Sequence, residues 1–266
     1  MKIFKNLLIS LVVLLSGVTA AGDEFSDGMR FMDEDDYGQA VDAFRKSATR
    51  GDPRAQTNLG ILYLNGQGVQ RDFKQAVYWF EQAAAQEHAG AQSSLGMMYT
   101  TGKGVPKDYE QALYWYQKAA EQGYAAAEFS LGYMHARGLG VEQDLEQAFH
   151  WYEKAALRGY AGAQYKLGAM YSNGRAVKQD HEKAAYWFGL AAQQGLSSAQ
   201  FSLGMSYLRG EGVPRDILEG YKLILSASFN IGKKSRDSRD LVRYTLTGEQ
   251  MDENQKFARE WQPAGV

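Results

Sequence analysis

The chain has 266 residues, of which 45% are hydrophobic and 23% are charged, the ordinary composition of a folded protein. Lys and Arg number 29 against 31 Asp and Glu, so the net charge is −2 and no basic excess exists to bind nucleic acid. Cysteine is absent, which excludes disulfide bonds, thiol nucleophiles and thiolate metal ligands.

The first residues have the three-part pattern of a secretory signal peptide. Lys2 and Lys5 precede an apolar run over residues 7–15, and small residues follow as far as the expected cleavage point after Ala20. We therefore expect residues 1–20 to be removed and the mature protein to be periplasmic or secreted. An uncleaved membrane anchor is the alternative, but the uncharged stretch is short for a bilayer span, so no stable membrane insertion is expected after cleavage.

A period of 36 residues runs through most of the remaining chain. The residues that recur at this spacing are Ala55, Ala91, Ala127, Ala163 and Ala199; Leu59, Leu95, Leu131, Leu167 and Leu203, each followed by Gly; Asp72, Asp108, Asp144, Asp180 and Asp216; and Trp79, Trp115, Trp151 and Trp187. A fixed period of this length indicates a solenoid, in which each repeat packs on its neighbours.

Each repeat is predicted to contain two helices. Ala55 and Leu59 lie on one face of the first helix, and Gly60 on the same face lets a neighbouring helix approach closely. Gly66 ends that helix, and Asp72 caps the backbone N–H groups of the second. The repeated aspartates are therefore interpreted as helix caps rather than acid–base catalysts, and the Gly-x-Gly turns as helix connections rather than phosphate loops.

The segments that flank the repeats are predicted to be caps, which a solenoid needs at its ends. Residues 21–52 are expected to form a degenerate repeat, and residues 53–232 five full repeats of the 36-residue pattern. Residues 233–266 are expected to hold a charged segment and a capping helix. A disordered tail is the alternative for this last segment because its charge density is high.

The recurring pattern resembles that of a known family. Its parts are Ala-x-x-x-Leu-Gly-x-x-Tyr, a Gly-x-Gly-Val turn, Asp, and Ala-x-x-Trp-Tyr/Phe-x-x-Ala-Ala, and together they resemble the Sel-1-like repeat family, relatives of tetratricopeptide solenoids. The resemblance covers about residues 53–231. It implies an all-α, right-handed superhelical solenoid of antiparallel helix pairs, with a concave face made mainly by the first helices. It also implies a non-enzymatic scaffold or adaptor that binds a protein or peptide.

Recognition is expected at positions that vary between repeats, because the constant positions build the solenoid. By analogy with tetratricopeptide proteins, two positions on each first helix would face the groove. They are Thr57 and Ile61, Ser93 and Met97, Phe129 and Tyr133, Tyr165 and Ala169, and Phe201 and Met205. This stripe is either inter-repeat core or a groove for an apolar peptide or helix. Arg137 and Arg209, near the turns, are either solvated or hold an acidic group of the ligand.

No catalytic residue, cofactor or metal site is predicted. The four histidines share no metal-ligand spacing. An envelope hydrolase or penicillin-binding enzyme with this type of repeat is an alternative, but the chain lacks the Lys-Thr-Gly motif of those enzymes. A structural assembly factor for an envelope complex is a further alternative. Within the scaffold interpretation, a regulator of an envelope signalling system and a host-interacting factor both stay open.

Overall fold

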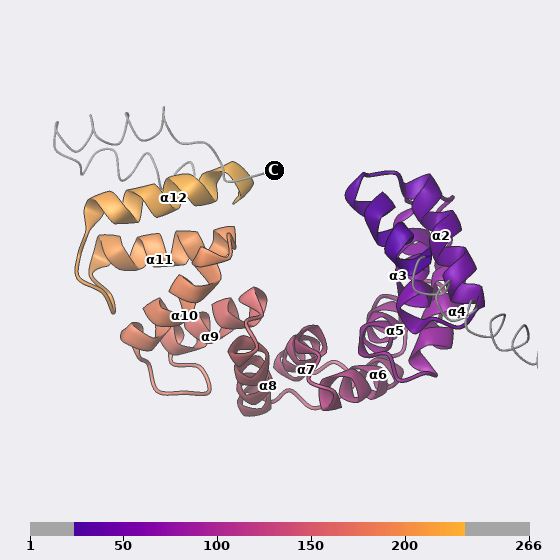
Figure 1. Cartoon of the computed structure of the whole chain (residues 1–266). Helices are drawn as coiled ribbons and strands as arrows, with labels where there is room; N and C mark the ends of the chain where they lie inside the picture. The colour runs from indigo at the N-terminus through magenta and orange to yellow at the C-terminus, as the bar shows by residue number, and fades with distance from the viewer. Residues whose placement is uncertain (1–23, 232–266) are drawn as a thin grey trace, which may run out of the picture. The chain divides into compact units, whose positions relative to one another are not determined.

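The structure, a computed structural model, describes residues 24–231, and these residues contain helices and no strand (Figure 1). A helix over residues 24–33 comes first. The helices that follow are α2 (Tyr37–Thr49), α3 (Pro53–Asn65), α4 (Phe73–Ala84), α5 (Ala89–Thr101), α6 (Tyr109–Glu121), α7 (Ala125–Arg137), α8 (Leu145–Leu157), α9 (Ala161–Asn173), α10 (His181–Gln193), α11 (Ser197–Arg209) and α12 (Ile217–Ile231). The predicted signal peptide and the predicted C-terminal segment, residues 233–266, lie outside the described residues.

The described residues fall into two compact units, which divide between Ala127 and Glu128. In the first unit each helix from α2 to α6 packs against the next one along the chain, and in the second unit the same holds from α8 to α12. Packing between sequence neighbours is the defining property of a solenoid. The predicted all-α architecture of stacked helix pairs is therefore confirmed.

The repeated aspartates cap the second helix of every pair. Asp72 Oδ1 accepts hydrogen bonds from the backbone nitrogens of Lys74 and Gln75 at 2.9 and 3.1 Å, at the start of α4. Backbone N–H groups of the other second helices bond in the same way to Asp108, Asp144, Asp180 and Asp216. Each carboxylate thus satisfies backbone donors that have no partner inside the helix, as the sequence predicted.

Left-handed residues end most of the helices. Gly66, with φ of 72°, terminates α3 through a bond from its N–H to the Leu62 carbonyl. In two places the pattern has lost its glycine but kept the backbone geometry. Ala176 has φ of 63° in the turn after α9, and Glu87 has φ of 61° after α4. A side chain in this region is strained, because its Cβ crowds the following carbonyl oxygen.

In the first four repeats, the glycine that follows the repeated leucine lies against an aromatic ring of the second helix; in the fifth repeat, Gly204 lies against Ile224 and the Gly220 backbone instead. A Cβ at Gly60 would lie 2.6 Å from Phe80 Cε1, and one at Gly168 would lie 2.5 Å from Phe188 Cδ1. Phe80 is completely buried beside Ala76, Ala83 and Ala84 of the same helix. The two helices of a pair can therefore approach closely only where the side chain is missing, which confirms the predicted reason for this glycine.

A partly buried polar contact joins a buried side chain of the first helix of a repeat to an exposed side chain at the end of the second helix, 30 residues later. Three of these contacts are amide pairs, in which Nε2 donates to Oε1: Gln86 to Gln56 at 2.9 Å, Gln122 to Gln92 at 2.8 Å, and Gln194 to Gln164 at 2.8 Å. The third repeat has an ion pair instead, with Arg158 Nε 3.1 Å from Glu128 Oε1, and Glu128 is only 2% exposed.

Candidate functional site

The predicted groove residues of the first unit contribute mainly to packing. Thr57 is 7% exposed, and its hydroxyl oxygen lies 2.9 Å from His88 Nδ1. Ser93 is also buried, and Ile61 and Met97 pack against the core cluster of α4 and α5. Thr57 and Ile61 in addition border an open depression of about 580 Å³. The core interpretation of the stripe fits these four side chains well.

Two pockets lie along the first helices of the second unit. Pocket A, of about 290 Å³, is bounded by α7, α8 and α9, and its lining includes the predicted residues Tyr133, Arg137 and Ala169. Pocket B, of about 390 Å³, lies between α9, α10 and α11, and its lining includes the predicted residues Tyr165, Ala169, Phe201, Met205 and Arg209. Because Ala169 and Asn173 line both pockets, the two adjoin each other.

Phe129 is the predicted residue of this unit that lines neither pocket. Its ring centroid lies 5.5 Å from that of Tyr152 and 5.0 Å from that of Tyr160. The ring therefore packs between α8 and the start of α9. Tyr165 has a similar contact with Phe188 at 5.8 Å, although it also reaches pocket B.

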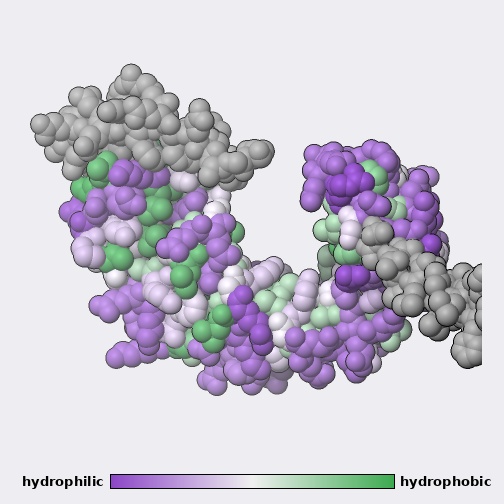
Figure 2. Space-filling model, viewed as in Figure 1, coloured by the Kyte–Doolittle hydropathy of each residue, from purple (hydrophilic) through white to green (hydrophobic). Residues whose placement is uncertain are grey.

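The side chains that face the pockets combine aromatic surface with charge. Tyr133 is 40% exposed, and the Arg137 guanidinium lies 5.9 Å from the centroid of its ring. Arg209 lies 3.7 Å from the Glu211 carboxylate. Figure 2 shows hydrophobic residues interspersed with hydrophilic ones over this unit, at the left of the view. The surface is therefore mixed in character rather than a continuous apolar patch.

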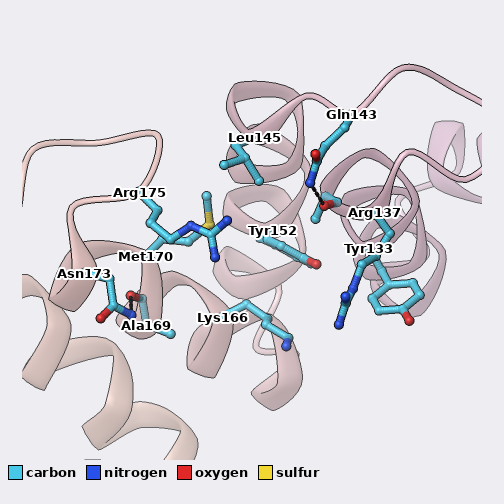
Figure 3. Close-up of a pocket in the computed structure, with 11 residues that line it drawn as sticks. Tyr133, Arg137, Gln143, Leu145, Tyr152, Lys166, Ala169, Met170, Asn173 and Arg175 are labelled. Carbon is cyan, nitrogen blue, oxygen red and sulfur yellow. Dashed lines mark hydrogen bonds between the residues drawn. The ribbon is translucent and has the colours of Figure 1, made fainter.

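Pocket A also contains cations that our sequence analysis missed. Lys166 comes from α9, Arg175 comes from the turn after α9, and both line the pocket with Arg137 (Figure 3). A signal for them is present in the sequence. Lys166 occupies a position at which the other first helices carry a neutral residue, namely Asn58, Ser94, Ser130 and Ser202. A charged residue at a position that is neutral in the other repeats indicates that the surface of this repeat differs from theirs.

The wall that α8 contributes to pocket A includes the Tyr152 phenol. The residue is 3% exposed, and Figure 3 shows its hydroxyl pointing toward Arg137 and Lys166. Burial raises the pKa of the Tyr152 phenol, and Tyr133 raises it further, whereas Arg137 lowers it. The hydroxyl therefore stays protonated at neutral pH and can donate a hydrogen bond into the pocket.

Two further properties of residues 24–231 bear on function. The His, Asp and Glu side chains in this range form no cluster of three that could hold a metal ion. Within the same range, every helix is too short or too polar to cross a bilayer.

The repeat pattern matches a known family profile. Residues 53–88, 89–124, 125–160, 161–196 and 197–228 each match the Sel1 repeat. The chain is a Sel1 repeat protein. Each matched repeat contains one of the helix pairs described above, and the Sel1 repeat is a fold of protein-interaction scaffolds that are generally non-catalytic.

Several solved structures resemble this one. A Sel1 repeat protein from Oxalobacter formigenes is 30% identical, with a TM-score of 0.76, over 88% of this chain and 98% of its own. The immunity protein Pa5087 from Pseudomonas aeruginosa is 25% identical, with a TM-score of 0.52, over 72% of this chain and 75% of its own. A putative Sel1 repeat protein from Klebsiella pneumoniae, 23% identical with a TM-score of 0.52 over 76% of this chain and 99% of its own, shares the fold. No curated protein sequence matched the chain.

Proposed function

We propose that this Sel1 repeat protein is a non-enzymatic scaffold that binds a partner protein or peptide along pockets A and B. The observation that carries the proposal is that aromatic, methionine and arginine side chains from α7, α9 and α11 border two adjoining pockets. Aromatic residues, methionine and arginine are the side chains most enriched at protein interfaces. A partner segment lying along both pockets would contact several repeats at once, which is how repeat proteins use their extended surfaces.

The proposed place of action is the periplasm or the exterior of the cell. The support for this is the signal-peptide pattern of residues 1–20, with its basic start, apolar run and small residues. In that compartment the scaffold would serve as a regulator of an envelope signalling system or as a factor that engages a host protein.

The test is affinity capture with cross-linking, in which a tagged chain starting at residue 21 is exposed to envelope extract and bound proteins are identified by mass spectrometry. The pocket variant combines Tyr133→Ala with Met205→Glu, which removes an exposed ring from pocket A and places a charge in pocket B. Phe129 is left unchanged because its ring packs between helices. We expect a partner that the native chain captures and that the pocket variant loses.

A matched control carries the same kinds of substitution away from the pockets. Tyr186→Ala and Leu157→Glu alter side chains that are 61% and 73% exposed and that line neither pocket. Circular dichroism of all three proteins establishes that each is folded. Equal loss of the partner in both variants, or its retention by the pocket variant, would contradict the proposal. A partner that never exchanges and always co-fractionates would instead indicate a structural assembly factor.

A further inference from the structure

Pocket A holds three cationic side chains and no acidic one. Arg137 comes from the last turn of α7, Lys166 from the middle of α9, and Arg175 from the turn that follows α9. Figure 3 shows Arg137 and Lys166 approaching from the side toward which the Tyr152 hydroxyl points. Because like charges around one small cavity repel each other, an anion placed among them is stabilised.

None of these three cations forms an ion pair within residues 24–231. The neighbouring arginines differ, since Arg158 pairs with buried Glu128 and Arg209 of pocket B lies 3.7 Å from Glu211. Glu211 and Arg175 occupy the same position of the turn in successive repeats. At this position Glu211 offsets the charge of Arg209 in pocket B, whereas Arg175 adds a positive charge to pocket A.

The neutral groups of pocket A fit a ligand that carries an anion beside an apolar part. The protonated Tyr152 hydroxyl supplies a donor next to the cations, and Leu145 and Met170 supply apolar wall. Gln143 and Asn173 hold the rim in place, since their side-chain nitrogens each donate to a backbone carbonyl at 2.8 Å (Figure 3). The donors and the apolar wall thus belong to one compact site.

We infer that pocket A binds a side-chain carboxylate of an acidic segment on the partner, an inference that rests on the proposed scaffold function. Arg137 and Arg175 can each form paired hydrogen bonds with a carboxylate, and Lys166 and Tyr152 supply further donors. A volume of about 290 Å³ accommodates an acidic side chain with an apolar neighbour against Leu145. The whole chain carries a net charge of −2, so the attraction is local and does not favour a long polyanion such as nucleic acid.

The test uses an array of random decapeptides with amidated C-termini, probed with the fluorescently labelled chain from residue 21. We expect the bound peptides to be enriched at least twofold in Asp and Glu over the library, next to an apolar residue. Replacing those acids by Gln or Asn should weaken binding about tenfold in solution anisotropy, the scale of one charge-assisted contact. Raised salt should weaken the acidic peptides most.

Two double variants, used beside the Tyr133→Ala and Met205→Glu pocket variant, separate this inference from the scaffold proposal. Arg137→Gln with Arg175→Gln removes two cations from pocket A, whereas Lys118→Gln with Lys74→Gln removes the same charge from exposed positions of the first unit. We expect the acidic enrichment to disappear with the first pair and to persist with the second. Peptides that depend on Tyr133 and Met205 but show no acidic preference would support the scaffold and overturn the carboxylate site.

Two other results would also overturn the carboxylate site. One is an acidic enrichment that survives Arg137→Gln with Arg175→Gln, and the other is an array on which the chain binds no peptide. A phosphoserine series replaces each selected Glu in a second array. Tighter binding of phosphoserine by tenfold or more would reassign pocket A to a phosphate group, whereas equal or weaker binding would support the carboxylate.

Discussion

At the residue scale, the ion pair of the third repeat is the clearest departure from the repeating core. Glu128 is 2% exposed, and its Oε1 is 3.1 Å from Arg158, while its Oε2 has no hydrogen-bond partner. Arg158→Ala should lower the free energy of unfolding by about 2 kcal/mol, because the buried Glu128 carboxylate would lose the half-exposed cation that satisfies it. Urea denaturation followed by circular dichroism measures this change.

The neighbouring repeats supply the control for this prediction. They hold two glutamines at the same positions, 2.8–2.9 Å apart. The double variant Glu128→Gln with Arg158→Gln should therefore restore an amide pair and unfold within about 1 kcal/mol of the native chain. A double variant as unstable as Arg158→Ala would show that the charge itself, and not the satisfied pair, stabilises this position.

A second prediction at this scale concerns the strained alanine. Ala176 has φ of 63° at a turn position where the other repeats have glycine. Ala176→Gly should raise the free energy of unfolding by about 1 kcal/mol, because relief of the strain exceeds the extra freedom that glycine gives the unfolded chain. Ala169→Gly, inside right-handed helix α9, should instead lower the free energy of unfolding by a similar amount. Two changes of the same sign would contradict the strain argument.

At the scale of the elements, replacing glycine by alanine should change the free energy of unfolding in opposite directions at two positions of one helix pair. A Cβ at Gly168 in α9 would lie 2.5 Å from Phe188 Cδ1, whereas a Cβ at Gly189 in α10 has no neighbour within 4 Å. Gly168→Ala should destabilise the protein by about 2 kcal/mol through overpacking. Gly189→Ala should stabilise it by about 1 kcal/mol through helix propensity alone. Thermal and urea unfolding of both variants give the two signs directly.

The helices themselves could be predicted well from the sequence, because the same residues that begin, end and pack each helix recur in five successive repeats. The Asp caps, the glycine at the end of the first helix and the close approach at Gly60 each follow from a local rule. The polar pairs that join residues 30 apart escaped sequence analysis, although Gln56, Gln92, Gln164 and Gln200 keep the period. A glutamine inside a helix has no strong positional preference, so only the packed structure shows its partner.

At the scale of the whole molecule, stability should be distributed along the chain rather than shared by one core. Within each unit the contacts join helices that are adjacent in sequence. Unfolding of such an array is less than all-or-none. We expect differential scanning calorimetry to give a calorimetric enthalpy larger than the van't Hoff enthalpy, and Gly168→Ala to broaden the transition as well as lower its midpoint. Equal enthalpies would show that the repeats unfold as a single unit.

The candidate site was less predictable than the fold. Spacing along a helix placed Tyr133, Arg137 and Met205 on pocket walls, but it placed Phe129 on the same stripe although that ring packs between helices. The direction of a large side chain depends on the volume left by its neighbours, which period alone does not contain. Arg175 lies in a turn, and its approach to pocket A depends on the three-dimensional path of that turn.

The ion pair between half-exposed Arg158 and buried Glu128 also bears on which helices of the chain pair with each other. Five nearly identical helix pairs can exchange partners, since the first helix of one repeat offers the same apolar face as that of another. An exchange that includes the third repeat would set Glu128 beside a glutamine and bury a carboxylate without a cation. A first helix of one repeat that packs on the second helix of another therefore carries a penalty at this position, and the ion pair favours the native pairing of helices within the third repeat.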